Sequence, residues 1–339
     1  MHDWMLLAAG EAATHNLSIF DPVSPPAESI RSLSVLVLAI AAVIFLVVEG
    51  VLLYSIYRFR RRADDSGASE PPQVYGSKSI EVAWTAAPAL IVFVLVLVTT
   101  RTLWEVNVDP PQPKVGDQAL FVTVVGRQWW WEYVYDRYDG QPLGFITANE
   151  LHVPAGAAGR PRPVYLTLKS ADVCHSFWVP RLAGKTDLIP GHTNQAWFQT
   201  SQTGLYVGQC AEYCGTQHAN MLLRVVVDKP ADFERWLEHE RQPATEDPAA
   251  AEGKKAFLAQ SCVNCHRVRG TPARGTYAPD LTHLMTRQTL AAGIIPNTPE
   301  NLRRWISAPQ QVKPGCLMPA FGLNEHDWEL VTRYLLSLD

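Results

Sequence analysis

The sequence predicts a multidomain membrane protein that combines a two-helix transmembrane hairpin, an exported domain of short β-strands and an all-α C-terminal domain. Three observations support this fold class: two long apolar runs, dense strand patterns between residues 118 and 227, and helical patterns after residue 249. A chain of 339 residues has room for about two soluble domains. The net charge of −4 and 47% hydrophobic residues suit a globular or lightly anchored protein, and we expect no nucleic-acid partner.

Two apolar runs, residues 32–57 and 82–100, predict the hairpin, because the first carries one charge, Glu49, and the second none. Each run can cross a hydrocarbon core of about 30 Å as a helix rising about 1.5 Å per residue. A buried core helix is the alternative, and a cleaved signal peptide competes for the first run, although no small-residue cleavage site follows it. The loop between them, residues 58–81, holds five Lys and Arg residues against one in residues 1–31. The positive-inside rule therefore places the loop in the cytoplasm and both termini outside.

The pattern after the hairpin divides the chain further. Six segments read as strands: residues 119–125, 129–135, 164–168, 196–200, 205–208 and 222–227. Such strand density indicates a sandwich or barrel. A stretch rich in Pro, Ala and acidic residues follows, as in linkers. The expected organisation is an exported N-terminal segment 1–31, a hairpin 32–104, a strand domain 105–228, a linker 229–248 and a helical domain 249–339.

Four side chains that can bind a soft metal lie close together in the sequence: Cys210, Cys214, His218 and Met221. Thiolate, thioether and imidazole ligands together favour copper. One thiolate is enough for a mononuclear copper site, whereas two thiolates can bridge two copper ions that share one electron. A binuclear site also needs a second imidazole, and His175, at the end of the strand that starts at Val164, can supply it.

Three other interpretations of this cluster stay open: a disulfide, structural zinc with two Cys and two His ligands, or ordinary packing of His218 and Met221. Zinc does not call for Met221, nor for the aromatic and apolar neighbours of His175. We therefore interpret the cluster as a copper site. The two remaining cysteines outside recognisable motifs, Cys174 and Cys316, are expected to be small buried residues.

A second motif, C-V-N-C-H, begins at Cys262 and is the attachment signal of a c-type haem. Cys262 and Cys265 can form thioether links to the haem vinyl groups, and His266 can reach the iron. A redox-active cysteine pair is the alternative, but the exported position and the later M-P-A-F segment favour haem. Met318 is the expected sixth ligand, and Met285 is the competing methionine.

The region 30–228 resembles cytochrome c oxidase subunit II with its CuA domain, a cupredoxin-type Greek-key barrel. The motifs that carry the resemblance are G-Q-C-A-E-Y-C-G-T-Q-H-A-N-M, S-A-D-V-C-H-S-F-W-V-P, G-R-Q-W-W-W-E-Y and K-T-D-L-I-P-G. The resemblance implies a full ligand set for two copper ions: bridging thiolates from Cys210 and Cys214, imidazoles from His175 and His218, a weak ligand in Met221 and the backbone carbonyl of Glu212.

The resemblance implies three further roles. The Glu212 carboxylate would reach a Mg or Mn ion shared with subunit I, Trp129 would accept electrons at the surface, and Glu81 would feed a proton channel in subunit I. A solvated carboxylate, a barrel-core aromatic and a helix N-terminal acid are the respective alternatives. The chain departs from the family pattern at Arg127 and His192, where many relatives have His and Arg.

The C-terminal region resembles class I cytochromes c, because Y-A-P-D-L, which starts at Tyr277, is similar to the segment whose proline carbonyl orients the axial histidine. The two resemblances together imply the electron-accepting subunit of a terminal haem-copper oxidase. Electrons would pass from soluble cytochrome c through haem c and CuA to subunit I, which reduces O2 to water and pumps protons.

Subunit I, and with it subunit III, would be the partners, and the expected location is the bacterial inner membrane with both redox domains on the periplasmic side. A free-standing membrane electron carrier and the electron module of a nitric oxide reductase are the alternatives. A metal chaperone would not need covalent haem.

Overall fold

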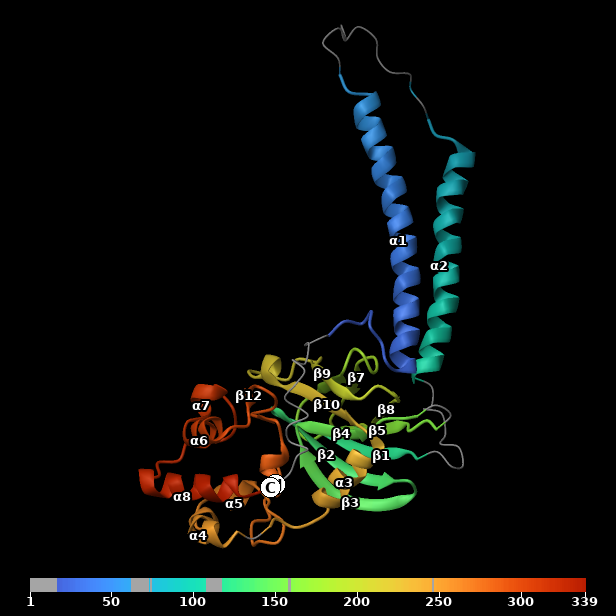
Figure 1. The fold of residues 1–339 in the computed structure, drawn as a ribbon. Coiled ribbons are helices and arrows are strands. Elements are labelled where there is room, and N and C mark those ends of the chain that lie inside the picture. Colours follow the sequence, from blue (N-terminus) through green and yellow to red (C-terminus); the bar gives the residue numbers. More distant parts are fainter. Residues whose placement is uncertain (1–16, 62–72, 74, 108–117, 158–159, 246) are drawn as a thin grey trace. The chain divides into compact units, whose positions relative to one another are not determined.

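Figure 1 shows the computed structural model, which describes residues 17–61, 73, 75–107, 118–157, 160–245 and 247–339. The chain forms two units, Glu28–Val108 and the remainder, and each is described by itself. Parts of the expected N-terminal segment and cytoplasmic loop, residues 1–16, 62–72 and 74, lie outside the described residues.

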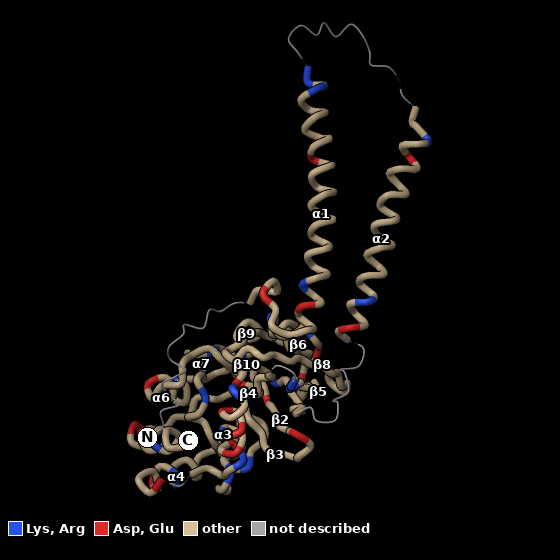
Figure 2. Tube along the Cα trace, turned by 45° about the vertical axis from the view of Figure 1, so that its right-hand side comes forward, with Lys and Arg blue, Asp and Glu red and all other residues tan. Residues whose placement is uncertain are grey.

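The hairpin consists of two long helices, α1 (Pro25–Arg58) and α2 (Lys78–Asn107), which contain the two expected apolar runs. Their large apolar side chains, such as Leu46 and Phe93, are exposed. Figure 2 shows that charged residues gather near the helix ends, with Glu49 as the exception within α1. Helices of this length whose apolar surface has no protein cover are built to contact lipid.

The strand domain is a sandwich of two five-stranded sheets, ordered β3-β2-β1-β5-β8 and β4-β10-β9-β6-β7 (Figure 1). The strands are β1 (Leu120–Arg127), β2 (Trp130–Tyr138), β3 (Gln141–Ala148), β4 (Glu150–Pro154), β5 (Val164–Ser170), β6 (His175–Trp178), β7 (Thr186–Leu188), β8 (Asn194–Phe198), β9 (Gly204–Cys210) and β10 (Leu222–Asp228). β1 runs parallel to β5 and β4 runs parallel to β10, whereas the other paired strands are antiparallel. This mixed pairing fits the expected cupredoxin-like fold.

Alternation along the strands builds the core of the sandwich. Every second residue of β1 is buried, and on β2 the side chains of Trp131, Tyr133 and Tyr135 point into the core with no exposed surface. Within the segment expected as a linker, residues 230–240 form α3 (Pro230–Glu240), and its Phe233 and Leu237 are buried in the same core. α3 therefore packs as part of the sandwich.

The C-terminal domain is helical, as expected, with a second core of its own. Its elements are α4 (Ala251–Leu258), α5 (Cys262–Cys265), a two-stranded ribbon of β11 (Thr289–Leu290) and β12 (Ile295–Pro296), α6 (Pro299–Ser307), α7 (Pro309–Val312) and α8 (Glu325–Leu336). Helix α6 starts where the Thr298 hydroxyl accepts from the Asn301 amide at 3.2 Å. A Cβ on Gly253 would lie 2.3 Å from the Leu330 carbonyl, so only glycine lets α4 pass so close to α8.

Candidate metal centres

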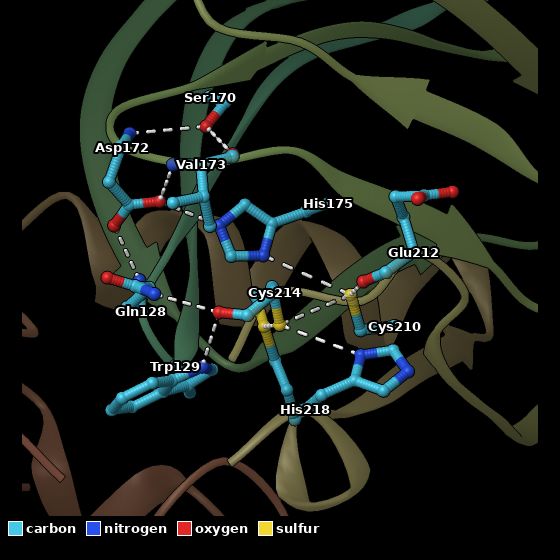
Figure 3. Close-up of polar contacts among 11 residues, drawn as sticks. Gln128, Trp129, Ser170, Asp172, Val173, His175, Cys210, Glu212, Cys214 and His218 are labelled. Carbon is cyan, nitrogen blue, oxygen red and sulfur yellow. Dashed lines mark hydrogen bonds and ion pairs between the residues drawn. The ribbon is translucent and has the colours of Figure 1, made fainter. Parts of the chain in front are cut away.

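Figure 3 shows that His175, Cys210, Cys214 and His218, which the sequence predicts as copper ligands, lie around one point. The Cys210 and Cys214 sulfur atoms lie 3.8 Å apart, with His175 Nδ1 3.9 Å from Cys210 Sγ and His218 Nδ1 3.6 Å from Cys214 Sγ. The Met221 sulfur lies 3.9 Å from Cys214 Sγ. A disulfide requires sulfur atoms at about 2.05 Å, and all six cysteines are free.

Glu212 and Tyr213 lie in the copper ligand loop, residues 210–221. The Glu212 carbonyl accepts from the Cys210 thiol at 3.2 Å, so it faces the cluster. Its carboxylate points away from the sulfur atoms in Figure 3. The Tyr213 ring is 75% exposed and packs edge-on against His218 at 5.7 Å between centroids. The loop thus directs one oxygen of Glu212 inward and its carboxylate outward.

His175 begins its own strand, β6, instead of ending the strand that starts at Val164 as the sequence suggested. Strand β5 stops at Ser170, and β6 lies in the other sheet. A polar turn makes the crossing, because the Ser170 hydroxyl accepts from the Asp172 amide at 3.2 Å and the Asp172 carboxylate accepts from the Val173 amide at 2.7 Å. Cys174, expected to be buried, is exposed in this turn. That expectation was wrong because the turn faces solvent.

Asp172 is a functional residue that sequence reasoning missed. Its carboxylate lies 2.7 Å from His175 Nε2 and also accepts from the Gln128 amide at 2.6 Å. An N–H at His175 Nε2 donates to this carboxylate and leaves Nδ1, which faces Cys210, free to bind metal. The signal in the sequence was an acidic residue three positions before a ligand histidine.

The ionisation of one thiol in the cluster suits metal binding. Contact with Cys214 lowers the pKa of the Cys210 thiol to about 3, and the same contact raises the pKa of Cys214. Burial alone would lower the pKa of His175, but its hydrogen bonds to Asp172 and Cys210 raise it. A metal ion needs thiolates and a free imidazole nitrogen, and the cluster offers one readily ionised thiol with a second beside it. The donor set therefore fits a copper pair.

Trp129 lies directly beside the copper ligands. Its ring Nε1 donates to the Cys214 carbonyl at 2.9 Å, and the Gln128 side-chain amide donates to the same oxygen at 2.8 Å. Only 9% of Trp129 is exposed. The residue expected to accept electrons at the surface is thus covered within this chain, although it does touch the copper ligand loop.

The haem motif forms the short helix α5, and its histidine is oriented as the resemblance implied. His266 Nδ1 lies 2.8 Å from the Pro279 carbonyl, so an N–H there leaves Nε2 free for iron. Burial lowers the pKa of His266, which favours the neutral imidazole that a metal binds. Cys262 and Cys265 are partly exposed, and a Cβ on Gly275 would lie 2.3 Å from the Cys265 carbonyl carbon. These residues fit a covalent haem held at the domain surface.

The two candidate methionines both lie at the edge of the helical core, partly buried. Met318 lies in the segment between α7 and α8, and its carbonyl accepts from the Gln310 side-chain amide at 3.0 Å. The Met285 amide donates to the Leu338 carbonyl at 2.9 Å, which ties Met285 to the C-terminus of the domain. Met318 as the sixth ligand stays a prediction.

The first site offers thiolate, imidazole and thioether ligands to copper, and the second offers two thiols and an imidazole to a c-type haem. The fold and the two sites therefore define a membrane-anchored electron-transfer protein with a copper centre and a covalent haem.

Matches to models of known protein families identify the class of this protein more narrowly. Residues 12–101 match the transmembrane domain of cytochrome c oxidase subunit II, residues 120–229 match its periplasmic domain, and residues 250–339 match cytochrome c. The chain is 33% identical to cytochrome c oxidase subunit 2 of Alkalihalophilus pseudofirmus, over 98% of this chain and 94% of that protein. The Bacillus subtilis protein of the same name is 32% identical, over 95% of this chain and 92% of that one.

Among solved structures, the periplasmic domain of subunit II of cytochrome oxidase from Bradyrhizobium japonicum is 31% identical, with a TM-score of 0.32. That match covers 36% of this chain and 93% of the other.

The chain belongs to the cytochrome c oxidase subunit II family, with a cytochrome c domain fused at its C-terminus. It is therefore a subunit of a haem-copper oxidase, an oxidoreductase, with subunit I as a partner in the membrane. Its two domains outside the helices imply CuA copper and haem c. The two apolar helices and the two subunit II family matches indicate an inner membrane protein with a periplasmic domain.

Proposed function

We propose that this chain is the electron-accepting subunit of a terminal oxidase in which electrons pass from soluble cytochrome c to haem c, then to CuA, then to subunit I. Reduction of O2 to water on subunit I, coupled to proton pumping, completes the reaction. When bound, the copper pair and the haem iron supply one-electron redox chemistry. The protein residues hold the two centres and the path between them.

The observation that carries this order is a direct contact between the copper ligand loop and the loop before Met318. The Gln217 side-chain amide donates to the Pro314 carbonyl at 2.5 Å. A Cβ on Gly315 would lie 3.2 Å from Thr216 Cγ2, so the two loops approach closely at two neighbouring positions. A haem bound by Met318 and a copper pair bound by this loop would therefore be neighbours in one chain, which favours transfer between them.

Net charge supports the same contact. Residues 249–339 hold ten Lys and Arg against seven Asp and Glu, whereas residues 106–248 hold twelve against sixteen. Opposite net charges attract the two domains, and salt screens part of that attraction. The linker adds a high effective concentration, so transfer within the chain outcompetes direct reduction of CuA by a free donor.

The remaining roles follow the family resemblance. Glu212 would bind Mg or Mn at the boundary with subunit I, and Glu81 would lead protons toward subunit I. Glu81 lies in the first turn of α2. Arg58, Arg60 and Lys78 lie at the ends of α1 and α2 that the loop joins, which supports a cytoplasmic loop and periplasmic termini (Figure 2).

Replacing Met318 with Leu tests the order of carriers. The expected result is a changed haem c midpoint potential and slower reduction of CuA by soluble cytochrome c, because the sixth ligand is lost. Photochemical injection of electrons directly into CuA should still drive subunit I at the parent rate. Met285→Leu is the matched control and should leave both measurements unchanged. Oxidation of soluble cytochrome c at the parent rate by Met318→Leu would show that haem c is a side branch and that Trp129 is the electron acceptor.

A further inference from the structure

Lys313 is a buried lysine that joins the two redox domains. It follows α7 in the cytochrome domain and is 3% exposed. Its ammonium group donates to the Trp129 carbonyl and the Asn220 carbonyl, each at 2.8 Å, and to the Ala291 carbonyl at 3.1 Å. Two of these acceptors belong to the copper domain and the third to the cytochrome domain.

The chemistry of the group suits this position. Burial lowers the pKa of Lys313 to about 7. Three carbonyl oxygens oppose that effect, because only a protonated amine has three N–H bonds to donate. Burying a lysine costs free energy unless its N–H groups have hydrogen-bond acceptors. Two of the three acceptors of Lys313 are in the copper domain, so these bonds exist only while the domains stay docked.

Both acceptors in the copper domain are next to the copper site. Trp129, whose carbonyl binds Lys313, also donates from its ring to the Cys214 carbonyl at 2.9 Å. Asn220 directly precedes the ligand Met221. A single side chain of the cytochrome domain thus binds both the turn between β1 and β2 and the end of the copper ligand loop.

A second set of contacts docks the segment around Ala291. The buried Glu150 carboxylate accepts from the Gln288 amide at 2.9 Å and from the Thr289 hydroxyl at 2.6 Å. The Leu222 amide donates to the Ala292 carbonyl at 3.3 Å. Ala291 and Ala292 have left-handed φ values of 55° and 62°, a costly conformation for alanine that surrounding contacts must maintain. Contacts with the copper domain therefore help to hold the backbone conformation of the segment around Ala291.

We propose that Lys313 is a positioning residue that locks the cytochrome domain, with its Met318 loop, onto the copper ligand loop and thereby sets the rate of electron transfer between them. This inference rests on the proposed function, in which haem c donates to CuA. One electron leaves the haem iron and one arrives at the copper pair, and no atom or proton is transferred. Lys313 acts through Trp129 and Asn220, which touch or adjoin copper ligands.

The test uses the complete oxidase with Lys313→Met, which keeps the length of the side chain and removes its three donors. A photoreductant delivers one electron to haem c, and the absorbance of both centres reports its arrival at CuA. Electron transfer within the chain should slow by about tenfold or more. Hydrogen bonds from a charged donor are individually strong, so their loss should leave the two domains docked for less of the time. The matched control is Lys255→Met on α4, whose side chain is 74% exposed and which should transfer at the parent rate.

Hydrogen exchange supplies a readout that does not depend on turnover. The Gln288 and Leu222 amides, which donate across the domain boundary, should exchange faster in Lys313→Met and at the parent rate in Lys255→Met. The CuA signature should persist in both variants, because Lys313 is not a copper ligand. Unchanged exchange, or faster exchange with an unchanged rate of transfer, would overturn the positioning role.

Amine labelling of the parent oxidase keeps the proposal testable if the variant does not assemble. Lys313 should react roughly tenfold or more slowly than Lys255, because its labelling requires local opening. Equal labelling would overturn the proposal. Failure of the proposed function gives a different result: Met318→Leu would oxidise soluble cytochrome c at the parent rate, while the photoreductant experiment would still report the effect of Lys313.

Discussion

The copper and haem centres of this chain are built in opposite ways. The copper ligands come from β6, the end of β9 and the following loop, so two distant segments must fold before the site exists. The haem residues Cys262 and Cys265 lie in one short helix, and His266 directly follows it. The copper site is thus a product of tertiary packing, whereas the haem site is mostly a product of local sequence.

Burial follows the same division. His175, Cys210 and Cys214 are each at most 3% exposed, whereas Cys262 and Cys265 are partly exposed. A buried site is preorganised by the residues around it, and its properties depend on many neighbours. A partly exposed haem site relies on covalent attachment instead. Substitutions should therefore separate the two centres cleanly.

The largest expected effect is the loss of the copper pair in Cys210→Ser. A hydroxyl cannot replace a bridging thiolate, so the mixed-valence absorption and electron-spin signature should disappear while covalent haem remains. Absorption and electron paramagnetic resonance spectra of the purified complex measure both. Cys174→Ser is the control, since Cys174 is exposed and is not one of the predicted copper ligands. Loss of haem together with copper would contradict the separation of the centres.

The next effect is on stability, and a mirrored pair of substitutions tests it. Phe257 is 1% exposed in the cytochrome core, and Phe233 is fully buried in the sandwich core. Replacing either with Ala should lower the free energy of unfolding of its own domain by about 3–5 kcal/mol. Thermal unfolding can be followed by haem absorbance and by the CuA signal. Each variant should lower the unfolding temperature reported by the signal of its own domain, with little change in the other. An equal decrease of the unfolding temperature by both signals would show that the domains unfold as one unit.

A smaller effect is expected for Asp172→Asn. The amide removes the charge that orients His175 and places an NH2 against the Gln128 amide, so copper affinity should fall by about 10–100-fold. Competition with a copper chelator measures it. Asp136→Asn on β2, which loses only a contact with the Thr123 hydroxyl, should match the parent. Unchanged affinity in Asp172→Asn would mean that packing alone orients His175.

The smallest effect on either centre is expected for Glu81→Gln. Both metal spectra should be unchanged, while oxygen consumption and proton uptake slow, because the carboxylate serves proton delivery. Glu105→Gln, near the other end of α2, is the matched control and should leave turnover unchanged. Normal turnover and proton uptake in Glu81→Gln would reduce Glu81 to a helix-start residue.

Much of this architecture is readable from the sequence, and the exceptions have physical causes. β1, β2, β5, β8, β9 and β10 follow predicted strands because their apolar residues recur at the β period. β3 and β4 contain Pro142, Gly144 or Pro154, and β6 and β7 are too short for a period to show. The helical patterns around α4, α6 and α8 could be predicted because their apolar residues recur at the helical period, whereas α5 and α7 have only four residues each.

The site residues divide in the same way. The cysteines, His218 and His266 lie within local motifs, so their spacing reveals them. Asp172 acts through a turn between two sheets, and Lys313 acts through a contact with Trp129 184 residues away. Neither contact leaves a pattern in the sequence, because each depends on tertiary structure.

The uneven exposure of the copper ligands has a consequence for metal loading. Cys210, Cys214 and Met221 are almost fully enclosed, whereas His218 is partly exposed beside the exposed Tyr213 ring. Among these side-chain ligands, His218 is therefore the one that solvent reaches most readily. A copper ion that approaches the folded domain would meet this imidazole before it meets the enclosed thiolates.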